Sequence, residues 1–274
     1  MVEKILDNVN TKMPLVHCIT NYVTVNDVAN ILLACGGSPI MADDEKEVED
    51  ITSICNALVI NIGTLNERTI KSMVKAGKKA NELSHIVVLD PVGAGASALR
   101  TSSTFELLDK VKFSVIRGNI SEIKTVALGS GTTKGVDADV SDAVTEENLD
   151  EAIAFAKNLS TRTGAVIAIT GAIDIVADSK SAYIIRNGNA MMSKITGSGC
   201  MLTGVIAAYC AANPEQLLDA TAAAVCAMGL SGELAYDKLI KNDGGTSTYR
   251  SYIIDAISKM NADILQGGMK IESR

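Results

Sequence analysis

The residue types best suited to chemistry gather in the segment Thr196–Cys200, where two glycines flank a serine directly ahead of an apolar stretch. The pattern from 198 to 211 predicts a helix, whose first-turn N–H groups are free and whose dipole places positive charge at the same point. Such a turn can bind a phosphate or stabilise negative charge that develops during a reaction. It is not a P-loop, because no lysine follows the glycines. The candidate catalytic residues are therefore Gly197, Ser198, Gly199 and Cys200.

Two carboxylates stand where an expected strand gives way to a loop. Asp90 ends the β-branched run that begins at Ile86, and a proline and two glycines follow it closely. A carboxylate there can hold Mg²⁺ or its waters beside a polyphosphate, although an ordinary Asp-Pro turn explains the same residues equally well. Glu122 follows Asn119 by three residues, so it can orient magnesium-bound water or, more simply, complete a capping box. Asp90 and Glu122 are the candidate metal residues, and for both the structural alternative stays open.

Two further polar residues end predicted strands and suit a nucleotide. Arg117 closes the run 114–117, and its planar fork can meet a phosphate. Thr170 closes the run 165–170, and its hydroxyl can meet a nucleotide, although the same residue can simply begin a loop. Because ligands bind beyond the carboxyl ends of parallel strands, we expect both residues to lie near Asp90 and the glycine turn.

Three residues of the N-terminal third are also candidates for the functional site, and for each a purely structural role explains the same pattern. His17, one of two histidines, alternates within a strand that we expect to be buried, so it is predicted to be a core histidine with satisfied hydrogen bonds. Asn21 follows this strand and can serve merely as a helix cap. Met41 ends another strand; methionine usually fills gaps in such a place, but it can also line a pocket for an aromatic ligand.

The hydrophobic pattern predicts the scaffold that must position these residues, because short β-branched runs alternate with helical patterns as far as residue 170. The predicted strands are 15–19, 38–41, 57–62, 86–90, 114–117 and 165–170, and the predicted helices between them are 26–35, 45–55, 67–83 and 145–161. Such alternation is typical of an α/β fold with a central, mostly parallel sheet and helices on both faces, a three-layer α/β/α arrangement.

After residue 170 the pattern changes from alternation to runs of one kind. Two consecutive strands are predicted at 173–177 and 182–186, followed by helices at 198–211, 214–230, 231–241 and 249–265. Asn213 and Pro214 suit the cap and the first turn of the second of these helices. The segment Gly129–Asp142 is rich in Gly, Ser, Thr and Asp and is predicted to be a mobile loop. With no internal repeat and no clear linker, residues 1–274 are expected to form one domain.

Composition excludes several classes of function. A formal charge of −7, with only three Phe and no Trp, argues against a nucleic-acid partner, which needs a basic surface and stacking platforms. The six cysteines form no CxxC pair, so neither a zinc site nor a disulfide framework is expected. The N-terminus lacks an apolar signal core, and no apolar run looks long enough to span a bilayer. We therefore expect a cytoplasmic protein that has no membrane partner.

Seven segments, taken in order, resemble the hydroxyethylthiazole kinases, a family with the ribokinase-like fold. They are PLVHCITNYVTVNDVAN, GGSPIMA, LVINIGTL, LDPVGAGAS, IRGNISEI, AITG and KITGSGC, and they run from residue 14 to residue 200. Each is weak alone, whereas the ordered set is highly specific. The chain departs from the family pattern at a few positions. It has Gly37 and Ser97 where the family pattern has Ala and Thr. Its segment Gly244–Thr246 lacks the Gly-Pro-Gly sequence that is common in the family.

The resemblance implies transfer of the ATP γ-phosphoryl group to the alcohol of 4-methyl-5-(2-hydroxyethyl)thiazole in thiamine salvage. It implies that Met41, Gly197 and Asn21 belong to the substrate site and that Arg117 and Thr170 contact ATP. Asp90 and Glu122 match the acidic positions around Mg²⁺. The resemblance also implies a homotrimer with sites at the subunit boundaries.

Three alternatives remain beside this reading. An ADP-dependent dehydratase acting on hydrated nicotinamide nucleotides has a similar architecture but typically carries Asp where this chain has Cys200. A hydroxymethylpyrimidine or pyrimidine-phosphate kinase of the same fold usually carries Cys there, so only the first two family-like segments separate it. A non-catalytic nucleotide-binding subunit is disfavoured, because Asp90, Glu122 and the complete glycine turn are all retained.

Overall fold

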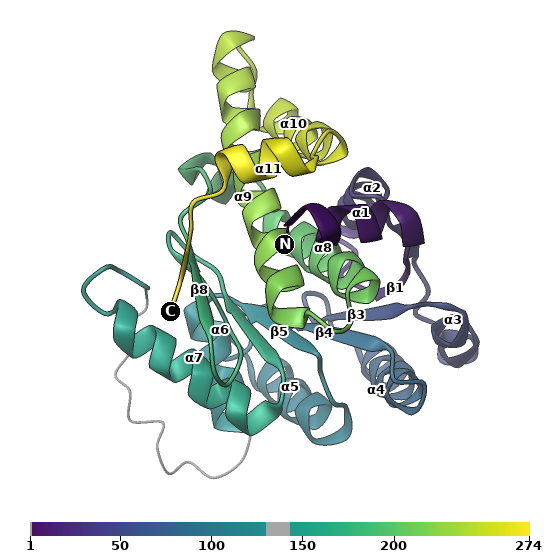
Figure 1. Cartoon of the computed structure of the whole chain (residues 1–274). Helices are drawn as coiled ribbons and strands as arrows, with labels where there is room; N and C mark the ends of the chain where they lie inside the picture. Colours follow the sequence, from purple (N-terminus) through teal and green to yellow (C-terminus); the bar gives the residue numbers. More distant parts are fainter. Residues whose placement is uncertain (1, 130–142) are drawn as a thin grey trace.

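The computed structural model describes residues 2–129 and 143–274, and a single sheet runs through them (Figure 1). Its strands are β1 (Leu15–Ile19), β2 (Ser38–Ile40), β3 (Ala57–Asn61), β4 (Ile86–Asp90), β5 (Val115–Gly118), β6 (Val166–Ile169), β7 (Asp174–Ala177), β8 (Ala182–Ile185) and β9 (Ile271–Ser273). Their order in the sheet is β2-β1-β3-β4-β5-β6-β7-β8-β9. Pairing is parallel from β2 to β6 and antiparallel from β6 to β9. The predicted mostly parallel sheet is confirmed.

Helices cover both faces of this sheet. They are α1 (Val2–Lys12), α2 (Val25–Ala34), α3 (Val48–Ile54), α4 (Glu67–Glu82), α5 (Ala98–Lys110), α6 (Ile120–Gly129), α7 (Leu149–Thr163), the 3₁₀ helix η1 (Ala190–Lys194), α8 (Ser198–Ala212), α9 (Leu217–Lys241), α10 (Thr246–Ser258) and α11 (Ala262–Gly268). Helices α3 to α7 pack on one face, and α1, α2 and α8 to α11 pack on the other (Figure 1). The predicted three-layer α/β/α architecture is confirmed.

The alternation of side chains along each strand produces two separate hydrophobic cores. In β4, Ile86 and Val88 pack in the core that contains α8, whereas Val87 and Leu89 pack in the core that contains α4 to α7. All five residues of β4 are buried, because parallel strands with helices on both faces expose neither side. A residue two positions beyond Val88 therefore also faces α8.

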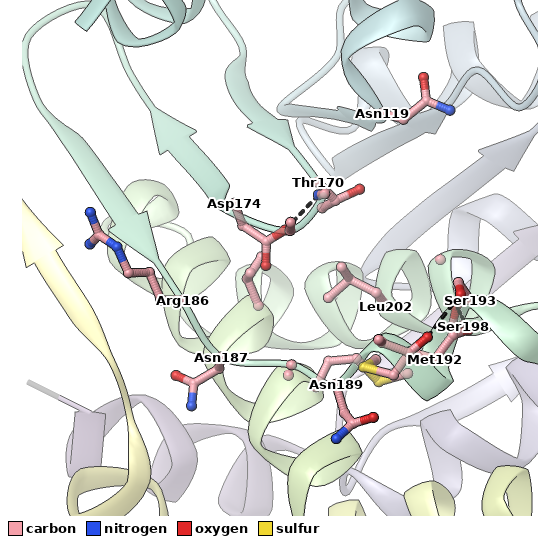
Figure 2. Close-up of a pocket in the computed structure, with 18 of the residues that line it drawn as sticks. Asn119, Thr170, Asp174, Arg186, Asn187, Asn189, Met192, Ser193, Ser198 and Leu202 are labelled. Carbon is pink, nitrogen blue, oxygen red and sulfur yellow. Dashed lines mark hydrogen bonds between the residues drawn. The ribbon is translucent and has the colours of Figure 1, made fainter. Parts of the chain in front are cut away.

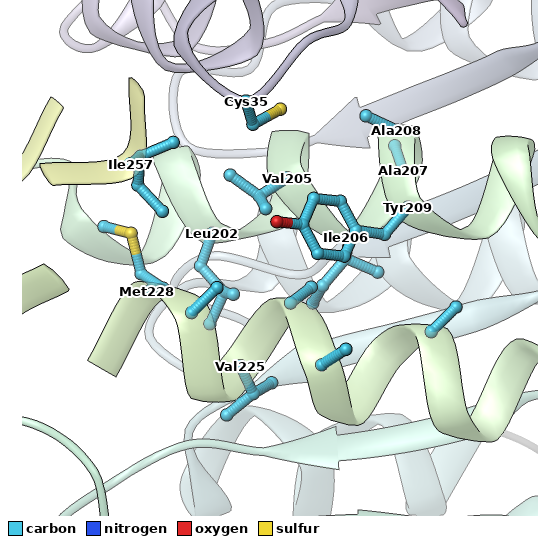
Figure 3. Packing of buried hydrophobic residues seen from close by; sticks show 14 of the residues in the cluster. Cys35, Leu202, Val205, Ile206, Ala207, Ala208, Tyr209, Val225, Met228 and Ile257 are labelled. Carbon is cyan, nitrogen blue, oxygen red and sulfur yellow. The ribbon is translucent and has the colours of Figure 1, made fainter. Parts of the chain in front are cut away.

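Helix α8 lies against the sheet and is held there by apolar contacts on almost every side. Every residue from Met201 to Cys210 is buried, as expected for a helix that is hydrophobic all round. Figure 3 shows Leu202 and Ile206 of α8 packed toward α9, and Val205 packed toward Cys35 and Ile257. The first turn of α8, residues 198–200, is only half-buried. A firmly held helix thus presents its N-terminal turn at the carboxyl edge of the sheet.

Helix α9 corrects two expectations. It is one continuous helix from Leu217 to Lys241, where two helices, 214–230 and 231–241, were predicted. Ser231 and Gly232, at the expected break, are buried against the rest of the protein, and Gly232 packs against the side chain of Met192. By length and composition α9 could cross a membrane, so the expectation that no apolar run is long enough was wrong. Most of its apolar stretch is buried inside the protein, as in the core helix of a globular domain.

Other boundaries also differ from the prediction. Helix α9 begins after Pro214, and the side chain of Asn213 donates to the carbonyls of Ile5 and Tyr209 instead of capping it. The predicted helix 249–265 is two helices, α10 and α11. Helices α1, α5 and α6 and strand β9 were not predicted. The predicted loop Gly129–Asp142 lies outside the described residues except for Gly129, which ends α6.

Candidate active site

Four polar side chains stand in a row along the carboxyl edge of the sheet, facing α8. Two positions beyond the last apolar residue that packs toward α8, strands β3 to β6 carry in turn Asn61, Asp90, Arg117 and Thr170. The guanidinium of Arg117 lies between two of them: its Nη1 is 3.4 Å from Asp90 Oδ1, and its Nη2 donates to Thr170 Oγ1 at 2.7 Å. The predicted gathering of Asp90, Arg117 and Thr170 is confirmed.

Asp90 is completely buried and joins the sheet to α8. Its Oδ2 accepts hydrogen bonds from Asn61 Nδ2 at 2.8 Å and from Thr203 Oγ1, one turn into α8, at 2.9 Å. Burial raises the pKa of Asp90 above its ordinary value, Arg117 partly opposes that rise, and Glu122 adds to it. A carboxylate that is shielded from solvent and has three polar partners therefore lies beside the first turns of α8.

The sulfur of Cys200 lies at the meeting point of two amide side chains. Asn21 Nδ2 and Asn61 Nδ2 each donate to Cys200 Sγ at 3.3 Å. Asn61 also donates to Asp90, so one amide connects the thiol and the buried carboxylate. The expected neighbourhood of Asp90 and the glycine turn is thereby confirmed.

The glycine turn has the backbone that its sequence requires. Gly197 occupies the N-cap position of α8 with φ of 89° in the left-handed region, and a Cβ there would lie 2.8 Å from Thr24 Cγ2. The N–H of Met201 donates to the Gly197 carbonyl at 2.8 Å, so the N–H groups of Ser198, Gly199 and Cys200 belong to the open first turn. The Ser198 hydroxyl donates to the Met192 carbonyl at 3.4 Å. The turn can therefore offer backbone donors to an anion.

Gly199 is required for a different reason. A Cβ at this position would overlap both terminal nitrogens of Arg117. The guanidinium cannot move away cheaply, because it is held by Asp90 and Thr170. The absence of a side chain at 199 thus lets the cation lie directly against the N-terminus of α8.

Glu122 forms the capping box that its spacing suggests. Its Oε2 accepts from the backbone N–H of Asn119 at 2.8 Å, and Asn119 Oδ1 accepts from the N–H of Glu122 at 2.9 Å. Its other oxygen accepts from the N–H of Gly93 at 2.8 Å. The structural alternative is confirmed, and the carboxylate also ties the loop after β4 to α6, near enough to Asp90 to influence its pKa.

Of the N-terminal candidates, His17 is a core residue, Asn21 contacts Cys200, and Met41 packs against a hydrophobic core. His17 is fully buried, bonded to Thr52 Oγ1 at 2.9 Å and to the Ala42 carbonyl at 2.8 Å, and burial lowers its pKa. The prediction of a satisfied core histidine is confirmed. Asn21 Oδ1 accepts from the backbone N–H and the hydroxyl of Thr24, both at 3.1 Å. Met41 follows β2 and is half-buried against the core that contains α8.

A cavity of about 690 Å³ opens beside Arg117, between the ends of β5 to β7 and helices α8 and α9 (Figure 2). Its lining includes Thr170, Ser198 and Gly199, and its apolar wall includes Leu202 and Met228. A mostly apolar cavity with a few convergent polar groups is typical of a small-molecule site. The Nε of Arg117 is buried and has no hydrogen-bond partner among the described residues, whereas its two terminal nitrogens are held by Asp90 and Thr170.

A second buried carboxyl group, Asp174, lines the same cavity (Figure 2). Its Oδ1 accepts from the N–H of Gly171 at 2.8 Å. Burial raises the pKa of Asp174 to about 7, although the Gly171 hydrogen bond and the charge of Arg117 oppose the rise. Near neutral pH this group is thus poised between its two protonation states.

We expect Asp174→Asn to stabilise the protein above about pH 7. A carboxyl whose pKa is raised to about 7 in the folded state costs stability that grows as pH rises from about 4 to about 7 and then stays constant, up to about 4 kcal/mol. Asparagine keeps the oxygen that accepts from Gly171 and removes that cost. Thermal unfolding from pH 4 to 8 measures the effect, and Asp178→Asn, at a half-buried turn that also accepts backbone N–H groups, is the matched control. Equal unfolding curves for Asp174→Asn and wild type at pH 8 would contradict the expectation.

Several site residues were missed by the sequence patterns. Asn61 ends an apolar strand, and its polarity at that position was the available signal. Thr203 carried none, because its contact with Asp90 joins distant segments. Asp174 is an acid within the apolar run predicted as a strand, and that position was its available signal. Arg100 is structural: its Nη1 donates to the carbonyls of Ile62 at 2.9 Å and Val92 at 2.6 Å, which ties the loops after β3 and β4 together.

Sequence comparison identifies relatives along the whole chain. The family model of the hydroxyethylthiazole kinase family matches residues 6–263. A hydroxyethylthiazole kinase from Clostridium acetobutylicum is 63% identical over 273 residues, covering 100% of both chains. Another from Clostridium beijerinckii is 54% identical over 271 residues, covering 99% of this chain and 96% of the relative.

Structural comparison agrees with the sequence comparison. A solved structure of a hydroxyethylthiazole kinase from Pyrococcus horikoshii superposes with a TM-score of 0.88 at 33% identity, covering 100% of this chain and 98% of that one. A ribokinase-like superfamily protein from Enterococcus faecalis has a TM-score of 0.63 at 11% identity, covering 93% and 88%, and shares the fold alone. With this fold, the glycine turn beside Asp90 and the match over residues 6–263, the chain belongs to the hydroxyethylthiazole kinase family.

Proposed function

We propose that residues 1–274 form one kinase domain that transfers the γ-phosphoryl group of ATP to the hydroxyethyl alcohol of 4-methyl-5-(2-hydroxyethyl)thiazole, in thiamine salvage. The observation that carries the proposal is the meeting of the first turn of α8, the Cys200 sulfur and the buried Asp90 carboxylate, all connected through Asn61. Family membership supports the choice of phosphoryl donor and acceptor.

ATP is proposed to occupy the cavity beside β5 to β7 with its phosphates toward the glycine turn. Arg117 places its guanidinium at that end, and Thr170 holds the guanidinium in place. A planar guanidinium suits phosphate oxygens better than a point charge does. The apolar wall with Leu202 and Met228 suits the flat face of a base.

The thiazole alcohol is proposed to lie on the other side of the turn, against Met41 and Gly197, with Asn21 beside it. Both ends of the Asn21 amide are already bonded, to Thr24 and to Asn61 and Cys200. Asn21 therefore shapes this part of the site and holds Cys200, rather than offering a free hydrogen-bonding group to the alcohol. A soft thioether such as that of Met41 packs well on an aromatic ring.

The chain's residues fit a magnesium ion held mainly by the nucleotide phosphates and water. Among residues 2–129 and 143–274 no cluster of three or more His, Cys, Asp or Glu could form a cage. Asp90 and Glu122 are two neighbouring carboxylates, and Mg²⁺ in kinases commonly uses one or two carboxylates beside phosphate and water. When bound, the ion neutralises charge on the transferred phosphoryl group. Asp90 and Glu122 are the residues proposed to face it.

The reaction needs positioning and charge stabilisation more than covalent chemistry from the protein, because phosphoryl transfer is largely dissociative. The alcohol oxygen forms a bond to the γ-phosphorus, and the bond from that phosphorus to the bridging oxygen of ADP breaks. The N–H groups of residues 197–200 and the Arg117 guanidinium face the negative charge that develops. The alcohol proton goes to a base, for which the Cys200 sulfur is the nearest candidate in this arrangement.

The purified protein, Mg-ATP and the thiazole alcohol provide the decisive assay. We expect ADP and the phosphorylated thiazole in equal amounts. Product formed only from an aminopyrimidine alcohol would instead identify a pyrimidine kinase, and loss of water from a hydrated nicotinamide nucleotide would identify a dehydratase. Nucleotide binding without any turnover would identify a non-catalytic subunit.

We propose that the protein is a cytoplasmic homotrimer with sites at the subunit boundaries, as the family resemblance implies. Tyr22 and Val23, directly after Asn21, are 78% and 58% exposed. Large apolar side chains beside a site are commonly covered by another subunit. Sedimentation equilibrium should therefore report three chains of 28.7 kDa each, and a stable monomer at micromolar concentration would contradict the proposal.

A further inference from the structure

The Cys200 thiol differs from other cysteines of the chain in the hydrogen bonds it makes. Cys18 and Cys35 donate their S–H to the backbone carbonyls of Val16 and Leu32. Within the described part of the chain, the Cys200 sulfur instead accepts two N–H donors and donates none. Hydrogen bonds donated to the sulfur favour its charged form over its neutral form. The two amides thus hold the Cys200 sulfur in place as a hydrogen-bond acceptor.

The orientation of both donors follows from neighbouring groups whose roles are unambiguous. Asn61 Oδ1 accepts from the backbone N–H of Gly63 at 2.9 Å and from Asn21 Nδ2 at 3.0 Å. Asn21 Oδ1 accepts from the backbone N–H of Thr24 at 3.1 Å. A backbone N–H can only donate, so each side-chain oxygen must lie toward it and each NH₂ group must lie toward the sulfur. The chain itself therefore fixes two donors on Cys200.

We infer that Asn61, assisted by Asn21, is a positioning residue that keeps Cys200 as a thiolate aimed at the substrate alcohol. The inference rests on the proposed kinase function and extends it. As the alcohol reacts, its O–H bond breaks, the proton passes to the Cys200 sulfur, and the oxygen forms its bond to phosphorus as ADP leaves. Asn61 also separates two negative groups, because one N–H of its amide meets the Asp90 carboxylate and the other meets the sulfur.

The test is the alkylation of Cys200 by iodoacetamide in the free protein, followed by mass spectrometry of the peptide that contains this residue. The other five cysteines are buried, so the native protein should react at Cys200. The rate at about pH 9 divided by the rate at about pH 7 reports how much of the thiol is protonated at neutral pH, independently of access. We expect Asn61→Ser and Asn21→Ser each to raise this ratio about threefold or more, since each removes a hydrogen bond to a charged group.

Asn213→Ser is the matched control, because Asn213 is also a buried asparagine with two backbone partners but lies at the far end of α8. It should leave the ratio unchanged. Asn61→Ser should also lower kcat with little change in the KM for ATP. An unchanged ratio in a folded Asn61→Ser or Asn21→Ser protein, or an equal rise in Asn213→Ser, would overturn the inference. Because alkylation requires neither ATP nor alcohol, its result stands apart from any failure of the kinase assay.

Discussion

Replacement of Gly199 by valine should abolish measurable phosphoryl transfer, with a loss of at least about 10²–10³ in kcat/KM, the usual effect of removing one preorganised donor to developing charge. Even a Cβ at this position overlaps the terminal nitrogens of Arg117. The guanidinium must then lose its contacts with Thr170 and Asp90. It is also displaced from the end of the cavity where the ATP phosphates are proposed to lie. Steady-state kinetics with Mg-ATP and the thiazole alcohol measure the loss.

Two companion variants give this result its meaning. Gly204→Ala adds a Cβ in the same helix, where the nearest side-chain atom, Leu32 Cγ, lies at 3.4 Å, an ordinary contact; it should keep near-wild-type activity. Cys200→Ser should keep measurable turnover, because the backbone of residues 197–200 and the Arg117 charge remain. If Cys200→Ser were as inactive as Gly199→Val, the thiol would be indispensable. The expectation that the backbone N–H groups of residues 197–200 contribute more to the rate than a base at Cys200 would then be wrong.

The central strands were predictable because burial on both faces produces a continuous apolar run. The runs 15–19 and 86–90 coincide with β1 and β4 residue for residue. Helix α1 was equally readable, since Val2, Ile5, Leu6 and Val9 recur at helical spacing and are all buried. Strand β9 was not, because it exists only through pairing of Tyr183 and its neighbours with residues about ninety positions later.

For the site as well, local sequence patterns predict some residues, whereas contacts between distant segments could not be predicted. The glycine turn and the strand-end residues Asp90, Arg117 and Thr170 follow from a period of two and from the rule for ligand sites in parallel sheets. The same period would have found Asn61, two positions beyond Val59 on the side of α8. No local pattern shows that Asn21 and Cys200, 179 positions apart, share a hydrogen bond. Spacing also could not decide between the two roles of Glu122, whose capping box emerged only from its bonds.

Asp90→Asn is the second substitution for which we expect a large effect, a loss of about 10²–10³ in kcat. If the new amide keeps its oxygen toward Asn61 and Thr203, its NH₂ group faces Arg117, which is itself a donor. If the amide turns over, two donors face the NH₂ group instead. In either orientation the guanidinium loses its counter-charge and its fixed place beside Gly199.

The dependence of the rate on pH separates this loss of charge from a general disturbance. Burial raises the pKa of Asp90, so wild-type kcat/KM should fall on the acid side at a pH above the ordinary range of an aspartate, as Asp90 takes up a proton and Arg117 loses its partner. The residual activity of Asp90→Asn should lack that acid limb, because no carboxyl remains to titrate. Asp219→Asn, at a half-buried carboxylate that accepts from the Tyr183 hydroxyl, removes an equal charge outside the site and should keep both the rate and the limb. An acid limb that persists unchanged in Asp90→Asn would assign it to another group, and near-wild-type kcat in that variant would mean that the charge opposite Arg117 does not serve the transfer.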